Sequence, residues 1–146
     1  MHASQAGQDS GLHNIFGPAA DTGAIPLTVI RRRAKRQLSR FDKFAREQLA
    51  EIGIAIPPAI SLISCPECDL TIDNRHPQLD TLLRWIEGNT LLAKNFKEVE
   101  VLFEMVRAAE LPGQTFPLSS CFHIGLTSAG PVAYFEEHIC SPTGLA

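Results

Sequence analysis

Four cysteines, with His123 and His138 close to two of them in the sequence, could bind a metal ion or support redox chemistry. Cys65 and Cys68 have the Cys-x-x-Cys spacing of half a zinc site. Two further pairs in the last third of the chain, Cys121-x-His123 and His138-x-Cys140, offer more sulfur and nitrogen ligands. The candidate zinc ligands are therefore Cys65, Cys68, Cys121 and His138, and the ion would tie the first pair to the C-terminal third of the chain.

Two other interpretations of the Cys-x-x-Cys pair stay open. The cysteines can be thiols that bound a turn, with Pro66 where a type I turn accepts proline. They can also form a redox pair, although the thioredoxin motif opens a helix and the residues from Asp69 onward alternate as a strand. No charged segment followed by an apolar one begins the sequence, so we expect a cytoplasmic protein with reduced cysteines.

A cluster of positive charge is the second candidate site. Its members are Arg31, Arg32, Arg33, Lys35 and Arg36, with Arg40 one turn further along. Residues 26–50 carry a net charge of +6 and residues 51–146 a net charge of −7, although the whole chain is only −3. Such asymmetry indicates a binding surface, and it does not identify the partner.

The sequence leaves the use of this basic cluster open. It can be a solvated helix face, or it can pair within the molecule with Glu98, Glu100 and Glu104. It can also contact the phosphates of a nucleic acid, an acidic protein or a membrane surface. A helix-turn-helix reader is disfavoured, because the helix expected over 91–110 has a net charge of −1.

The remaining candidate residues favour structural roles. His76 precedes Pro77 and fits a helix entry, and His123 fits a partly buried histidine. Trp85 lies beside an apolar helix face and fits either the core or a contact with a partner. The sequence contains none of the GxSxG, HExxH, GK[ST] phosphate-loop or GxGxxG motifs. We therefore expect no enzyme activity and no small-molecule substrate.

One long helix is expected to position the basic cluster. Apolar residues recur at steps of three or four from Leu27 to Ile52, which predicts an amphipathic helix over about 28–52. Thr28 is placed to cap this helix and Gly53 to end it. The sequence then predicts a hairpin, with strands at 59–64 and 69–73 on either side of the Cys-x-x-Cys turn.

Two helices and a second hairpin are expected in the rest of the chain. A short helix begins at Pro77, and a second helix capped by Thr90 continues to Leu111, which together predict an αα-hairpin. Segments 116–126 and 132–135 flank turn residues and predict strands. The fold class is thus α+β, with three helices and one or two antiparallel hairpins. The expected organisation is a disordered arm over 1–26, one domain over 27–140 and a frayed tail over 141–146.

Part of this pattern carries a resemblance. His76-Pro77 opens a helix, and Asn89-Thr90-Leu91-Leu92-Ala93 joins it to the next one. The segment 60–110 resembles small uncharacterised proteobacterial proteins with a His-Pro helix start and an Asn-Pro-x-Leu-Ala joint, where Thr90 replaces the proline. The resemblance implies a bacterial cytosolic protein and brings no known activity.

The function expected from the sequence is a small cytosolic interaction protein, an adaptor or regulator that binds a protein partner through its basic helix. The alternative is a nucleic-acid-associated regulator that contacts phosphates with the arginines between Arg31 and Arg36.

Overall fold

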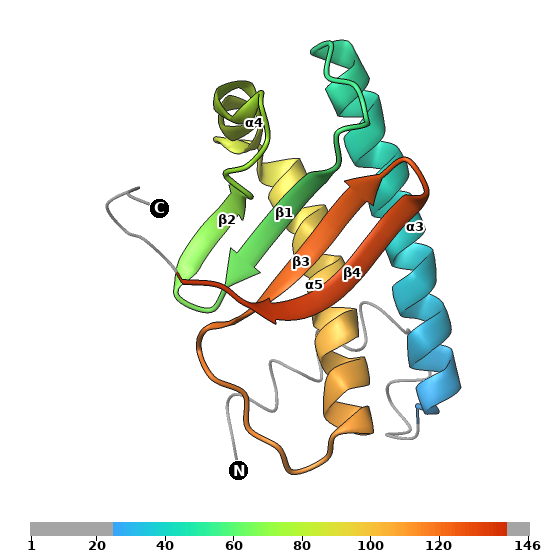
Figure 1. Cartoon of the computed structure of the whole chain (residues 1–146). Coiled ribbons are helices and arrows are strands. Elements are labelled where there is room, and N and C mark those ends of the chain that lie inside the picture. Colours follow the sequence, from blue (N-terminus) through green and yellow to red (C-terminus); the bar gives the residue numbers. More distant parts are fainter. Residues whose placement is uncertain (1–24, 140–146) are drawn as a thin grey trace.

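The computed structural model describes residues 25–139, in which a four-stranded sheet carries helices on one face (Figure 1). The elements in chain order are α3 (Leu27–Glu51), β1 (Ile60–Cys65), β2 (Cys68–Ile72), α4 (Leu79–Ile86), α5 (Thr90–Glu110), β3 (Ser120–Thr127) and β4 (Gly130–Glu137). This confirms the α+β fold class. Apart from residues 25–26, the predicted arm lies outside the described residues, as does the predicted tail over 141–146.

The sheet is built from the two predicted hairpins. Its strand order is β2-β1-β3-β4, and each neighbouring pair is antiparallel. The contact between the hairpins is the pairing of β1 with β3, in which Ile60 lies opposite Leu126 and Ser64 opposite Phe122. The sequence predicted both hairpins but not this pairing, which turns them into one sheet.

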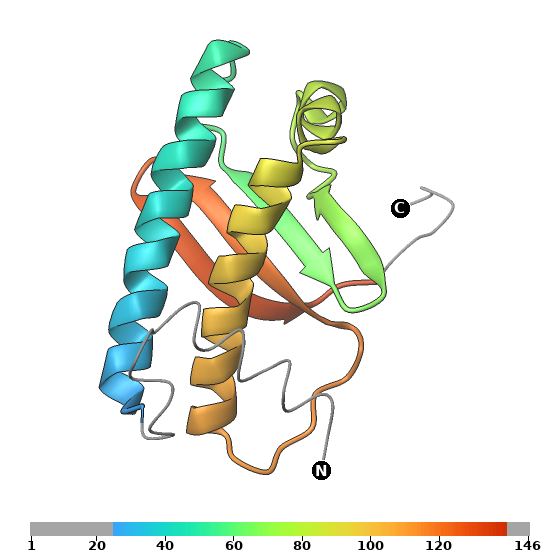
Figure 2. The ribbon, with the colours of Figure 1, turned by 180° about the vertical axis from the view of Figure 1, so that it is seen from behind.

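Helices α3 and α5 cover one face of the sheet and run antiparallel to each other (Figures 1 and 2). The buried residues of α3 follow its predicted apolar period: Ile30, Ala34, Leu38, Phe41, Ala45 and Leu49. The aromatic rings of Phe41 and Phe96 meet edge to face at 5.7 Å, and Phe96 meets Phe122 of β3 at 5.6 Å. These three rings join both helices to the sheet in one core.

Two predicted helix caps are wrong. Pro26 precedes α3 without a side-chain cap, so Thr28 lies inside the helix. The side chain of Asn89, not that of Thr90, caps α5 and accepts a hydrogen bond from the backbone N–H of Leu92 at 3.2 Å. Helix α4 follows β2 and contacts it, whereas α5 packs along α3. Within residues 25–139 no helix combines the length and apolarity needed to cross a membrane.

The two faces of the sheet differ. Side chains that alternate along each strand point to opposite faces, so Leu62, Phe122 and Ile124 face the helices and join the main core. The other face carries Ile63, Cys65, Cys121 and His123, and no helix of the described chain covers it (Figure 1). We call this the open face of the sheet.

Candidate functional site

Helix α3 positions the basic cluster by its amphipathic period. Its apolar stripe faces the sheet, so the residues on the opposite side project into solvent. The exposed basic residues of α3 are Arg31, Arg32, Lys35, Arg36, Arg40 and Lys43. We call the stripe from Arg32 to Lys43 the basic face, and at 1.5 Å of rise per residue it is about 16 Å long.

The basic face takes part in few contacts within the molecule. Arg31, beside it, forms an ion pair with Glu110 at the end of α5. No ion pair within residues 25–139 involves Arg32, Lys35, Arg36, Arg40 or Lys43. The five side chains of the basic face are therefore available to a partner.

The acidic residues of α5 have other partners. Glu98 accepts a hydrogen bond from Gln37 at 3.5 Å, and Glu100 pairs with Lys97 on its own helix at 3.3 Å. Burial and the neighbouring Glu100 raise the pKa of Glu104. Pairing of the basic cluster with these three glutamates, one of the alternatives left open by the sequence, is not what the structure shows.

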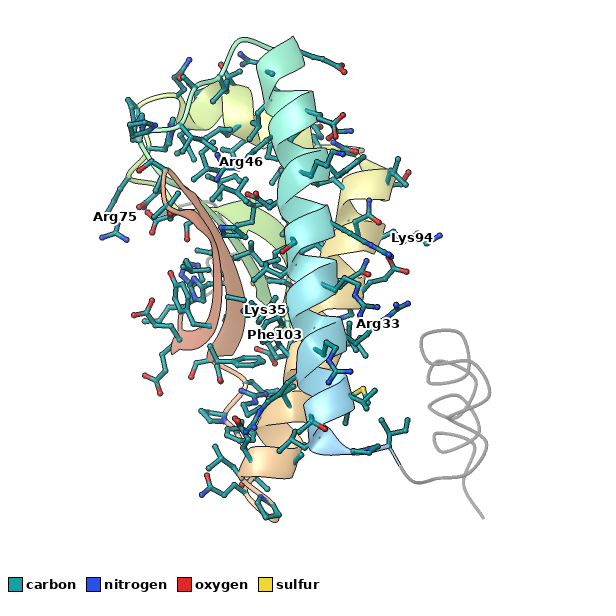
Figure 3. All side chains as sticks on the ribbon, turned by 90° about the vertical axis from the view of Figure 1, so that its right-hand side faces the viewer. Arg33, Lys35, Arg46, Arg75, Lys94 and Phe103 are labelled. Atoms are coloured by element: carbon teal, nitrogen blue, oxygen red, sulfur yellow. A yellow bond between two sulfur atoms is a disulfide. The ribbon has the colours of Figure 1, made fainter. Side chains whose placement is uncertain are left out.

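Arg33 and Trp85, two residues that the sequence predicted as partner contacts, are not part of the exposed basic face. Arg33 lies half-buried on the flank of α3 (Figure 3), and its Nε is buried with no hydrogen-bond partner among the described residues. Trp85 packs against the main core, and its indole N–H donates to Gln48 Oε1 at 3.0 Å. The structure thus places Trp85 with the core rather than with the basic face.

Lys43 is the residue of the basic face that sequence reasoning missed. It lies eleven residues after Arg32, which is close to three turns of helix and brings both onto one side of α3. The signal that could have found it is the same helical period that predicted α3, extended past the dense cluster of arginines.

Cys65, Cys68 and Cys121 are not thiols, so the expectation of reduced cysteines is wrong for these three, and Cys140 lies outside the described residues. Cys65 of β1 and Cys121 of β3 form a disulfide, and their Cα atoms are 4.4 Å apart. Cys68 is also disulfide-bonded. Metal ligation needs the thiolate, so zinc binding by Cys65, Cys68, Cys121 and His138 would first require reduction.

The histidines near this disulfide are grouped on the open face. His123 is buried, stacks on the ring of Tyr134 at 4.9 Å between centroids, and meets His138 edge to face at 6.4 Å. Burial lowers the pKa of His123, and a backbone hydrogen bond with Glu136 opposes this effect. Among residues 25–139, no three His, Cys, Asp or Glu side chains are arranged to hold a metal ion, so zinc stays a prediction.

Comparison with known proteins adds no further assignment. No family model, curated protein or solved structure matches this chain. The resemblance of segment 60–110 to small proteobacterial proteins therefore stays a prediction.

Proposed function

We propose that the protein is an adaptor or regulator that binds an acidic protein partner through the basic face of α3. One observation carries the proposal: five cationic side chains project from a single helix face without an ion pair in the described part of the chain. Since an exposed charge adds little to folding stability, these residues contribute little as structural elements.

The chemistry of the face suits carboxylates. An arginine guanidinium can donate two parallel hydrogen bonds to one carboxylate. Arg32, Arg36 and Arg40 follow one another at about 6 Å of helix rise, which matches glutamates or aspartates one turn apart on a partner helix. Clustered charge of one sign also steers the approach of an acidic surface and raises the association rate.

The disulfide favours a protein partner over a nucleic acid. Disulfides persist in oxidising compartments and are rare in the cytosol, and the Cys65–Cys121 bond lies within the fold. We therefore place the protein in an oxidising compartment, which replaces the cytoplasmic location in our proposal. Nucleic acid is then the alternative that the experiment has to separate.

The test is reversal of the charge at Arg32, Arg36 and Arg40, each to Glu. Affinity capture of partners from the native host, with and without nuclease, compares this triple variant with wild type. We expect the wild type to retain an acidic protein after nuclease and the variant to lose it. The free energy of unfolding should change by less than about 0.5 kcal/mol, because the three side chains are exposed.

The matched control is the pair Lys94→Glu and Arg84→Glu, which reverses exposed charges on two other helices, α5 and α4. This control should retain the partner. Capture that survives in the triple variant would show that the basic face is not the binding surface. A partner that disappears with nuclease, with a binding constant that falls steeply as salt rises, would favour phosphate contacts instead.

A further inference from the structure

A pocket of about 420 Å³ opens on the open face of the sheet, far from the outward side of α3. It lies between the start of β1, the segment after β2 and the turn that joins β3 to β4. Figure 3 shows Arg75 projecting from this side of the sheet, away from α3. The lining residues used below are Ser61, Asp73, Arg75, His76, Gly125 and Tyr134.

The floor of the pocket is made of small residues. Ser61 of β1 lies opposite Gly125 of β3, which lies opposite Val132 of β4. A Cβ atom on Gly125 would come within 2.9 Å of Val132 Cγ2. Because position 125 is glycine, the Val132 side chain can pack against the β3 backbone without a steric clash. The absence of a side chain there also leaves the pocket open beside Ser61.

His76 brings a buried hydrogen-bond donor to the lining. Its residue is only 8% exposed, and its Nδ1 accepts a hydrogen bond from the backbone N–H of Gln78 at 2.9 Å. Because Nδ1 is an acceptor, the proton of the neutral ring is on Nε2. That Nε2 is buried and has no partner among the described residues. A buried donor without an acceptor is costly, so an acceptor from a ligand would be favourable here.

Asp73 and Arg75 form an ion pair at the rim of the pocket, so their charges cancel. Arg75 donates to Asp73 from Nε at 2.9 Å, from Nη2 at 2.6 Å and from its backbone N–H at 3.0 Å. These hydrogen bonds lower the pKa of Asp73, so the pair is ionised at neutral pH. The lining therefore carries no net charge from this pair, while the second terminal amino group of the guanidinium and the unused carboxylate lone pairs can meet a ligand.

Tyr134 provides a flat wall. One face of its ring is fixed by stacking on His123, with 11° between the planes, and the residue is still 39% exposed. The neighbouring Val132 is 46% exposed. An aromatic face held in place beside hydrogen-bonding groups is suited to a ligand with one apolar side and a polar edge.

We propose that this pocket binds a neutral, polyhydroxylated ligand of the size of one or two sugar rings. The ligand's hydroxyls accept from His76 Nε2 and Arg75 and donate to Asp73, and its C–H face packs on Tyr134. A volume of about 420 Å³ falls within the usual range of small-molecule sites. Because Asp73 and Arg75 already neutralise each other, they offer no net charge to compensate the desolvation of a charged ligand, which favours a neutral one.

The probes are methyl glucoside, methyl galactoside, methyl N-acetylglucosaminide and cellobiose, each added at millimolar concentration to isotope-labelled protein. Sodium phosphate and sodium acetate at equal ionic strength serve as charged probes. Amide chemical shifts should change with at least one sugar, and the changes should be confined to the residues around Ser61, Asp73, His76, Gly125 and Tyr134. Tyr134→Ala should weaken this binding by at least about tenfold.

Tyr134→Phe keeps the ring and should bind nearly as wild type, and Leu118→Ala, an exposed residue outside the pocket, is the control for general surface effects. No shift with any sugar would overturn the proposal. Shifts of the same amides by phosphate or acetate in place of sugars would also overturn it, as would undiminished binding by Tyr134→Ala. None of these outcomes depends on the basic face of α3.

Discussion

Arg107 connects three elements through one guanidinium. Its Cζ lies 3.8 Å from the ring centroid of Phe116 and 3.7 Å from that of Phe135, and Nη1 donates to Ser120 Oγ at 3.0 Å. The side chain thereby ties the last turn of α5 to the segment before β3 and to the edge strand β4. Burial in this position lowers the pKa of Arg107.

Replacement of Arg107 by Ala should lower the free energy of unfolding by about 2 kcal/mol, because two cation–π contacts and a hydrogen bond are lost. Urea denaturation at neutral pH measures this change. Arg107→Lys is the matched variant, since it keeps the charge but not the planar group that lies between two rings. Full recovery of stability in Arg107→Lys would show that charge alone accounts for the contact.

The lowered pKa of His123 should make the free energy of unfolding depend on pH. Since burial lowers its pKa below the ordinary 6.5, the unfolded chain takes up a proton more readily than the folded protein. Stability should therefore fall as the pH drops below 6.5 toward the lower pKa of the folded state. The backbone and the carboxylate of Glu136, together with Asp73, raise the pKa of His123, whereas burial and His138 lower it.

The measurement is the free energy of unfolding of wild type and His123→Gln at several pH values on both sides of 6.5. The variant should show a smaller loss of stability at the acidic end. An imidazole titration that places His123 at or above the ordinary histidine pKa would contradict this account.

At the scale of the element, α3 shows what the sequence can predict. A 3.6-residue apolar period identified its core-facing residues and, by exclusion, the exposed arginines of the basic face. The caps are harder to predict, because Pro26 begins α3 without a side-chain cap and because Asn89 and Thr90 are adjacent residues that can both cap α5. Local period thus predicts the middle of a helix better than its ends.

The side chain of Asn89 stabilises the start of α5 through three hydrogen bonds. Its Oδ1 accepts from the N–H of Leu92, while its Nδ2 donates to Gln48 Oε1 at 3.0 Å and to the carbonyl of Trp85 at 3.2 Å. Asn89→Ala should therefore lower the free energy of unfolding by about 1 to 2 kcal/mol. Thr90→Ala, which removes the cap expected from the sequence, should have a smaller effect. Equal losses in both variants, measured by thermal or urea unfolding, would show that Thr90 shares the capping role.

At the scale of the whole molecule, the pairing of β1 with β3 is the feature that could not be predicted from the sequence. Each hairpin is local and carries its own turn signal, but Ile60 and Leu126 are brought together across two helices. The pocket has the same origin, because Ser61, His76, Gly125 and Tyr134 come from separate segments. The basic face was predictable because one helix holds all of it, and the pocket was not.

The Cys65–Cys121 disulfide locks that long-range pairing. It closes a loop across a sequence separation of 56 residues, and a cross-link of this length should stabilise the fold by about 4 kcal/mol through the lost entropy of the unfolded chain.

We expect the double variant Cys65→Ala/Cys121→Ala to lose about this amount of free energy of unfolding in urea, because Cys68 remains and only the cross-link between β1 and β3 is removed. Leu118→Ala, exposed and outside the cross-linked strands, should change stability little. A loss below about 1 kcal/mol would mean that the disulfide adds little to a β1–β3 contact already held by its ladder of hydrogen bonds.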